Sequence, residues 1–386
     1  MKSTSAKSES SAKHKKKSVL NKTIGFFLKS PFRAYLVGGF VRDTSLGAKI
    51  VDIDIVVEGS AIKAAQALNR KLHGELVMHQ NFGTASITTN SMRVDLASAR
   101  VEKYPKPATL PHVYPSTIIE DLNRRDFTIN AMAMSISKRN FGEIFDPFSG
   151  LDDIKKNIIR VLHRNSFIDD PTRIFRAVRY KNRFNFKIEK RTKTLMKEAV
   201  QKKMVRRLTG QRLLNEIRLI FMEDSYQESI KDIADLGIFA LKRKDLEILP
   251  KTGPYKMYFY ISRLGKINLP LSTKERKLMR DFNKAIDAIP RIHKASKNST
   301  LYNLLSPIPY DIVKVIPHIK PDLEKKIKLF MRIARTKPFI TGNDLKRLRV
   351  RPQKKYASLL RKMYNLQLDK RITTRRQALT YLRTSK

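Results

Sequence analysis

The stretch "VDIDIVVEG", residues 51–59, constrains this chain more than any other, because it sets two carboxylates in an apolar, β-branched run. Such a run predicts a buried strand. Side chains of a strand alternate between its faces, so Asp52 and Asp54 point the same way, where their like charges repel. A divalent cation would neutralise them, and Mg²⁺ binds one or two carboxylates together with substrate phosphates. A solvated edge strand is the alternative, and the apolar neighbours favour the metal site.

A glycine pair precedes this strand in "LVGGFVRD", where Gly38 and Gly39 follow an apolar run and open a helix. Glycines let backbone N–H groups approach a phosphate, and a helix N-terminus favours an anion. Arg42, in the first turn, could add a charge-assisted contact. A tight strand-to-helix turn is the alternative. A phosphate cradle beside paired carboxylates indicates a metal–triphosphate site.

A third acid, Asp95, lies in "RVDLAS", again inside an apolar strand. It could join the first two from a neighbouring strand, since two-metal phosphoryl chemistry needs such a cluster. An aspartate that caps a turn at the strand end is an equal alternative.

Two further motifs combine arginine with aspartate. In "EDLNRRDFTINAMA", residues 120–133, Asp126 is a helix-capping candidate whose functional interpretation is contact with ribose and phosphate. In "FIDDPTRIFRAVRY", residues 167–180, Asp170 precedes a proline at a first helical position. A carboxylate beside a guanidinium, as in Asp170 and Arg173, presents acceptors and donors to a base edge.

The same helix repeats arginine every three residues, at Arg173, Arg176 and Arg179. Three arginines on one stripe repel unless they meet anions. A solvated basic face is the alternative, but the apolar residues between them predict a packed helix whose arginines line a site.

The composition and the predicted secondary structure change along the chain. Residues 1–21 are rich in serine and lysine and predict a disordered basic tail, with an organellar targeting peptide as the alternative. Residues 22–150 alternate strand and helix patterns, and helical patterns dominate from residue 151. The sequence therefore predicts an α+β fold, in which a head with a small mixed or antiparallel sheet precedes an all-α remainder.

The charge balance indicates a polyanionic partner. Lysine and arginine number 80 against 35 aspartates and glutamates, a net charge of +45. Such a charge drives binding to nucleic acid by counterion release; a generally adhesive basic protein is the alternative. Without cysteine there is no disulfide framework or thiolate metal site. No apolar run has the length of a membrane span or a signal-peptide core, so we expect a soluble, cytoplasmic protein.

Taken in order, these motifs resemble the class II tRNA nucleotidyltransferases, the CCA-adding enzymes, to which bacterial poly(A) polymerases are related. The resemblance runs from about residue 34 to 383. It implies a catalytic head over 22–150, a nucleotide-selecting helical neck over 151–225, and a body and tail over 226–386 that hold the acceptor and TψC stem of tRNA. The matching stretches are "LVGGFVRD", "DID", "DLNRRDFTINAMA", "DPFSGLDDIKKNIIRVLH", "DDPTRIFRAVRY", "RRLTGQRLLNEI" and the C-terminal "FITGNDLKRLRVRPQKKYASLLRKMY…ITTRRQALTYL".

The resemblance also implies roles for single residues, with CTP and ATP as substrates. Asp52 and Asp54 would carry the catalytic Mg²⁺, and Asp95 is placed less firmly. Gly39 and Arg42 would hold the triphosphate, and Arg125, Asp126 and Asn130 would lie around the ribose. Asp170 and Arg173 would bind the edge of the base. Arg176 and Arg179 would support this site and the phosphates. Asp169 departs from the family, which usually has glutamate there.

The motifs are compatible with several reaction products. The same motifs serve enzymes that add CCA, only CC, only A, or a poly(A) tail. The loop "YPKPATLPHVYPS", residues 104–116, lies near a family loop that bears on completing the sequence. A non-catalytic RNA-binding protein with a degenerate head is the alternative from another class, and the intact Asp52 and Asp54 argue against it.

Overall fold

The computed structural model describes residues 3–48, 50, 52–239, 246, 255–265, 267–350 and 356–384. The chain divides into two compact units, Met1–Ile238 and Phe239–Lys386. Helix α10 (Tyr226–Asp235) packs against α7 (Thr172–Phe184) and so belongs to the first unit.

The first unit is built on a mixed sheet, as the sequence predicts. Seven strands of its described part pair in the order β3-β4-β5-β2-β1-β8-β9. The β2–β5 pair is parallel, whereas the other neighbours are antiparallel, including the β4–β5 hairpin. The strands are β1 (Arg33–Val37), β2 (Ile53–Glu58), β3 (Glu75–His79), β4 (Thr84–Thr88), β5 (Arg93–Ser98), β8 (Ala133–Ser135) and β9 (Ile144–Phe145).

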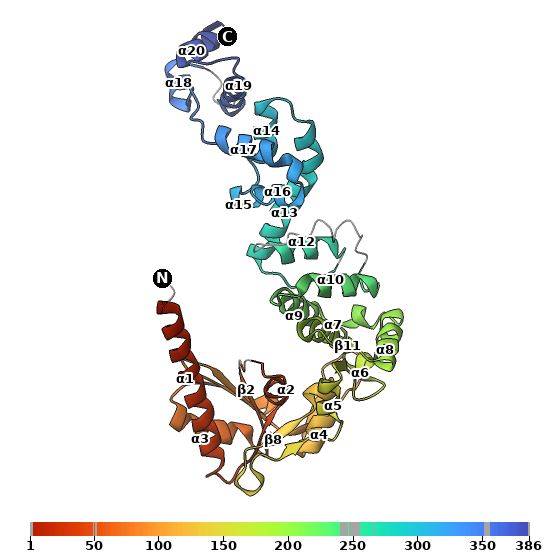
Figure 1. Cartoon of the computed structure of the whole chain (residues 1–386). Helices are drawn as coiled ribbons and strands as arrows, with labels where there is room; N and C mark the ends of the chain where they lie inside the picture. The colour runs from red at the N-terminus through yellow and green to blue at the C-terminus, as the bar shows by residue number, and fades with distance from the viewer. Residues whose placement is uncertain are drawn as a thin grey trace. The chain divides into compact units, whose positions relative to one another are not determined.

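The side chains of β2 alternate between the two faces of the sheet. One face packs into the core, and the other faces the candidate site. Ile53, Ile55 and Val57 are buried in a cluster that includes residues of helices α1 (Ser3–Phe27) and α3 (Ala61–Leu72). Val56, on the opposite face, packs in a second cluster with residues of α4 (Ile118–Asn123). Helices α1 and α3 lie together on their side of the sheet (Figure 1).

Helix α1 corrects the predicted disordered tail over residues 1–21, because the described chain is helical from Ser3. Its C-terminal half carries apolar side chains, including Val19, Ile24 and Phe27, that pack into the core cluster beneath the sheet. Burial of this apolar stripe stabilises a helix whose N-terminal half is too polar to suggest one.

The rest of the first unit joins the sheet to a helical region. The strands β6 (Arg100–Lys103) and β7 (His112–Pro115) form an antiparallel hairpin, and β10 (Ile158–Ile159) and β11 (Lys187–Ile188) form a short parallel pair. The remaining helices are α2 (Gly39–Ser45), α5 (Gly150–Lys155), α6 (Ser166–Asp169), α8 (Lys190–Gln201) and α9 (Gly210–Phe221).

The second unit is helical throughout its described part, as predicted. A capping box between Ser272 and Glu275 begins its longest described helix, α13. No described helix has both the length and the apolar character needed to cross a membrane. Its helices are α12 (Lys256–Arg263), α13 (Thr273–Lys294), α14 (Asn298–Leu305), α15 (Tyr310–Val313), α16 (Ile316–Ile319), α17 (Glu324–Ile333), α18 (Gly342–Arg347), α19 (Tyr356–Leu368) and α20 (Arg375–Thr384).

Candidate active site

A cavity of about 900 Å³ in the first unit gathers nearly every residue that the sequence singles out. Strands β2 and β5, the turn into α2, the segment that follows α4, and helix α7 contribute to its wall. The predicted residues that line it are Gly38, Gly39, Arg42, Asp52, Asp54, Asp95, Arg125, Asp126, Asn130, Asp170, Arg173 and Arg176.

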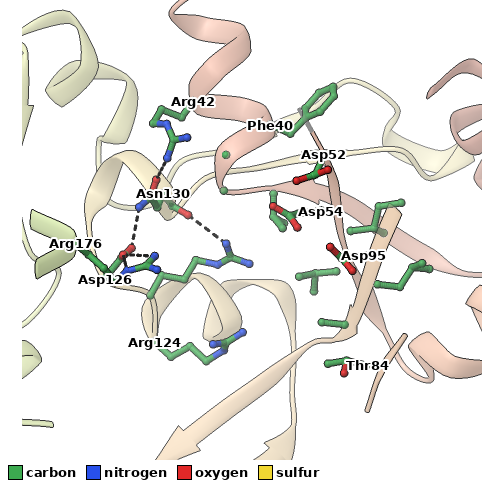
Figure 2. Close-up of a pocket in the computed structure, with 18 of the residues that line it drawn as sticks. Phe40, Arg42, Asp52, Asp54, Thr84, Asp95, Arg124, Asp126, Asn130 and Arg176 are labelled. Atoms are coloured by element: carbon green, nitrogen blue, oxygen red, sulfur yellow. Dashed lines mark hydrogen bonds and ion pairs between the residues drawn. The ribbon is translucent and has the colours of Figure 1, made fainter. Parts of the chain in front are cut away.

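Three carboxylates lie together at the sheet end of this cavity (Figure 2). Asp54 stands opposite Asp95 in the parallel register of β2 and β5, and Asp52 immediately precedes β2. Desolvation in the cavity floor raises the pKa of Asp54; the charges of Asp95 and Asp52 add to the rise, and Arg125 and Arg93 offset part of it. Like charge is thus concentrated where a cation would relieve it.

The three acids differ in their partners. Asp95 accepts a hydrogen bond from Arg93 Nε at 2.8 Å and another from the Ser86 hydroxyl. Asp52 and Asp54 form no ion pair with any other described residue. Within the described ranges no group of three or more acidic, histidine or cysteine side chains is arranged to hold a metal ion. The residues that would hold Mg²⁺ are therefore Asp52 and Asp54, whose carboxylate oxygens are ligands that suit this ion.

The backbone geometry of the turn before α2 favours glycine at position 38. Gly38 has φ +58°, and a Cβ there would lie 2.9 Å from Arg125 Nη1. The positive φ disfavours any side chain at this position, and a Cβ would displace the end of the Arg125 side chain. The turn thus keeps the start of α2 close to the Arg125 guanidinium and to the two aspartates.

A buried chain of polar contacts runs from α2 to α7 (Figure 2). Arg42, 4% exposed, donates to Asn130 Oδ1 at 2.5 Å, and Asn130 Nδ2 donates to Asp126 Oδ1 at 3.0 Å. Arg176 Nε donates to Asp126 Oδ2 at 2.7 Å, and the Phe127 amide donates to Oδ1 at 2.9 Å. Both oxygens of Asp126 thus accept hydrogen bonds, and the residue holds Arg176 and Asn130 in the cavity wall.

The pKa of Asp126 reflects this environment. Burial opposes its ionisation, but Arg176 and the Asn130 amide outweigh burial and lower the pKa to about 2. Asp126 is therefore a carboxylate at every physiological pH.

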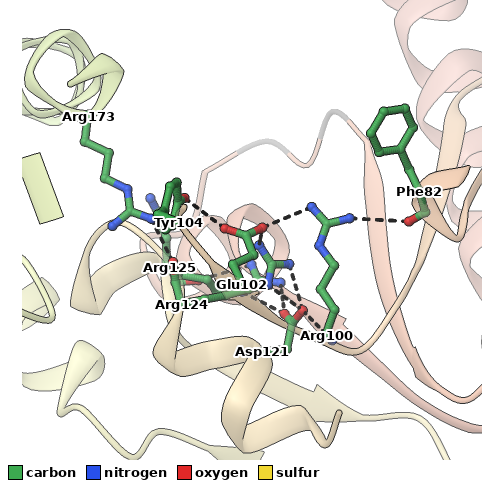
Figure 3. Close-up of polar contacts among 9 residues, drawn as sticks. Phe82, Arg100, Glu102, Tyr104, Asp121, Arg124, Arg125 and Arg173 are labelled. Carbon is green, nitrogen blue, oxygen red and sulfur yellow. Dashed lines mark hydrogen bonds and ion pairs between the residues drawn. The ribbon is translucent and has the colours of Figure 1, made fainter. Parts of the chain in front are cut away.

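A second polar network orients the arginines that follow α4 (Figure 3). Arg124 Nη2 and Arg125 Nη2 donate to the two oxygens of the fully buried Asp121 carboxylate at 2.7 and 2.9 Å. Arg124 Nη1 also donates to Glu102 at 2.8 Å, and the Tyr104 hydroxyl donates to the same carboxylate at 3.0 Å. Burial raises the pKa of Asp121, but the two arginines overcome it and the net pKa is lowered. The β6–β7 hairpin is thereby tied to α4.

The cavity wall also includes Asp170 and Arg173, the pair expected to read a base. Asp170 Oδ1 accepts from the Thr172 amide at 3.0 Å and from Arg212 Nη2 at 2.6 Å. Its Oδ2 accepts no hydrogen bond from the part of the chain that the structure describes. Arg173 donates to Ser166 Oγ at 2.6 Å and to the Arg124 carbonyl at 2.8 Å.

Arg179 does not line the cavity, contrary to the predicted stripe. It is buried, and its Nη1 donates to Glu223 at 3.3 Å. Arg183, which sequence reasoning missed, lines the cavity instead.

Other cavity residues were also missed. Tyr104, Tyr180 and Glu216 line it, and Glu216 Oε2 is buried without a hydrogen-bond partner among the residues that the structure describes. Glu216 lies one turn after Arg212 on α9, so the helical spacing from the "RRLTGQRLLNEI" motif could have found it.

Comparison with known proteins agrees with this geometry. Residues 34–160 match the family model "Poly A polymerase head domain", and residues 185–242 match "Probable RNA and SrmB- binding site of polymerase A". An A-adding tRNA nucleotidyltransferase of Aquifex aeolicus is 45% identical over 52% of this chain, and one of Geobacter sulfurreducens is 42% identical over 56%. The matched segment spans only 24% and 25% of those two proteins.

Solved structures match over almost the whole chain. A CCA-adding enzyme in its apo form II is 31% identical, with a TM-score of 0.78 over 96% of both chains. The Thermotoga maritima CCA-adding enzyme, solved in complex with tRNA, is 29% identical, with a TM-score of 0.73 over 95% of both chains. This chain therefore belongs to the tRNA nucleotidyltransferase family of the CCA-adding enzymes.

Proposed function

We propose that this protein is a metal-dependent, template-independent nucleotidyltransferase that adds nucleotides of the CCA sequence to the 3′ end of tRNA from CTP and ATP. The observation that carries the proposal is one cavity lined both by Asp52 and Asp54 and by Asp170 and Arg173. A nucleoside triphosphate would present its phosphates to the first pair and its base to the second.

The chemistry follows from phosphoryl transfer. The 3′-hydroxyl of the RNA attacks the α-phosphorus of the triphosphate, an O–P bond forms, and the bond to pyrophosphate breaks. Asp52 and Asp54 would hold Mg²⁺, which neutralises the developing charge and supports the leaving group. Arg125 lies beside the glycine turn and would hold the phosphates against α2. Arg42, which is buried on Asn130, keeps this turn and the Asp126 anchor in one arrangement.

Base selection is assigned to Asp170 and Arg173. Cytosine and adenine both carry an exocyclic amino donor, and the unoccupied Oδ2 of Asp170 is an acceptor for it. Arg173 would supply the donor half of the edge, and Asp126 fixes Arg176 beside them. CCA-adding enzymes similar to this chain have been solved in complexes with ATP and with CTP.

Transfer RNA is the proposed acceptor. The net charge of +45 suits a long phosphate backbone, and the helical second unit would contact the acceptor and TψC stem by shape and charge. A-form RNA is recognised mostly in this way, without base readout.

Addition of the terminal A alone is the second candidate. It is favoured by the two A-adding relatives, which are 45% and 42% identical to this chain. The match of CCA-adding structures to 95–96% of the chain favours the complete reaction.

Primer extension separates these products. Three tRNA transcripts, ending before CCA, after C and after CC, are incubated with Mg²⁺ and with CTP, ATP or both. Ordered completion to CCA followed by a stop supports the complete reaction, and addition of A to the CC end alone supports the second candidate. A long A ladder on any RNA, or no extension at all, contradicts the proposal.

A further inference from the structure

The helices α1 and α3 form a basic surface that the proposed reaction does not use. Its exposed lysines, which we call the α1–α3 basic patch, are Lys15, Lys17, Lys22, Lys29, Lys63 and Lys71. No aspartate or glutamate occurs in residues 10–42 or 59–74, the two segments that build it. None of the six lysines forms an ion pair within the described ranges.

The patch has a regular geometry. Lys15, Lys22 and Lys29 recur every seven residues, so they follow one side of α1 and the turn after it, about 10 Å apart. On α3, Lys63 and Lys71 flank Ala67 at four-residue spacing, which also defines one stripe. Two adjacent cationic stripes repel unless an anion lies along them.

A small pocket separates the two stripes. It has a volume of about 270 Å³ and combines aromatic rings with ammonium groups. The Phe26 and Phe32 ring centroids are 6.4 Å apart, and Lys29 and Lys71 line the same pocket. Aromatic faces beside a cationic track are the means by which proteins hold unstacked bases of single strands.

This surface is separated from the candidate active site by the sheet. Ile53, Ile55 and Val57 point into the core beneath α1 and α3, whereas Asp54 faces the large cavity on the opposite side. The patch is therefore distinct from the place where a primer 3′ end would react.

The apolar residues of α1 decide between an RNA and a membrane as the anionic partner. Val19, Leu20 and Ile24 pack against the core of the first unit. A helix that binds a bilayer must present its apolar face outward to the lipid, and α1 has already buried that face.

We propose that the α1–α3 basic patch binds single-stranded RNA, with its lysines along the phosphate backbone and one unstacked base against the pocket that Phe26, Phe32 and Ala67 line. This site is independent of the proposed catalysis, because it lies on the other sheet face and needs neither CTP nor ATP.

The test is binding of a fluorescent dodecauridylate to the full-length chain, measured by anisotropy across a salt series without nucleotides. The variant K15S/K22S/K29S removes three phosphate contacts, so the slope of log K against log salt should fall by about 2. The variant A67L fills the pocket, and it should weaken binding roughly tenfold without changing the slope. The matched control K155S/K156S/K231S removes three exposed lysines elsewhere in the same unit and should leave this binding unchanged.

Extension of tRNA, measured in parallel, should be unaltered in K15S/K22S/K29S, which shows that the protein is folded. Unchanged oligonucleotide affinity and slope in that variant would overturn the proposal. Equal affinity of the wild-type protein for a duplex of the same charge would overturn the assignment to single strands. Binding to phosphatidylserine vesicles that is lost in the variant, with RNA binding retained, would identify the patch as a membrane surface instead.

Discussion

Asp54→Asn should make the protein more stable and catalytically inactive at the same time. The pKa of Asp54 is raised by desolvation and then by Asp95, so its ionised form is disfavoured in the folded state. A carboxyl group whose folded-state pKa is raised lowers stability as pH rises through that pKa. At neutral pH in the absence of metal, the neutral amide removes this repulsion.

The magnitude follows from the strand pairing. Asp54 faces Asp95 directly across β2 and β5, and a like-charge cross-strand pair costs about 0.2–1 kcal/mol. In a unit of this size, 1 kcal/mol corresponds to about 2–4 °C in Tm, so an increase of roughly 0.5–4 °C is expected in EDTA. The gain should shrink as pH falls and Asp54 becomes protonated in the wild-type protein.

With Mg²⁺ bound, the wild-type protein should become more stable than Asp54→Asn. A ligand at ten times its Kd stabilises the folded state by about 1.4 kcal/mol, and the wild-type protein should show that increase. Asp54→Asn should show little of it, and nucleotide addition should fall by more than about a hundredfold, since even residues that only support metal ligands cost 10- to 100-fold. Thermal unfolding with and without Mg²⁺, together with primer extension, measures both effects.

Asp287→Asn is the matched control, because Asp287 is exposed on α13 in the other unit. It should alter neither activity nor the response to Mg²⁺. The reasoning is refuted if Asp54→Asn is less stable than wild type in EDTA, or if it keeps both the Mg²⁺ response and near wild-type addition.

Three further substitutions test the rest of the site. Asp126→Asn should lose about 2 kcal/mol at pH 7, because the pKa of Asp126 falls from 3.8 to about 2 on folding; this difference from wild type should disappear as pH falls from 4 towards 2, as urea unfolding at pH 7 and pH 3 can show. Asp170→Ala or Arg173→Ala should relax the choice between CTP and ATP in single-nucleotide extension, and unchanged selection would contradict their assignment. Gly38→Ala should reduce addition and cost about 1–2 kcal/mol, since φ is +58° and its Cβ would lie 2.9 Å from Arg125.

Local patterns accounted for most of the head. The alternation in "VDIDIVVEG" predicts β2, and the polar turn between "ASITTN" and "MRVDLAS" predicts the β4–β5 hairpin. Helix α1 was missed because its apolar contacts, such as Ile24 and Phe27, lie mostly beyond the lysine-rich stretch that dominates the composition.

Contacts between side chains far apart in the chain could not be predicted from the sequence. Arg42 meets Asn130, which lies 88 positions later in the chain, and Arg212 meets the Ala108 carbonyl, 104 positions earlier. Neither motif indicates which residue its arginine will contact, because an arginine can donate hydrogen bonds to any acceptor that the fold brings near. The contact of Asp126 with Arg176, 50 positions later, is of the same kind.

The arginine stripe of α7 shows how helical geometry sharpens such an inference. With 3.6 residues per turn, each three-residue step falls about 60° short of a full turn. Arg179 is therefore rotated by about 120° from Arg173, which is enough to carry it off the cavity wall. Arg183 follows Arg176 by seven residues and is only about 20° away, so it shares the face that lines the cavity. The α7 arginines that line the cavity are thus Arg173, Arg176 and Arg183, and seven-residue spacing identifies the last of them where three-residue spacing does not.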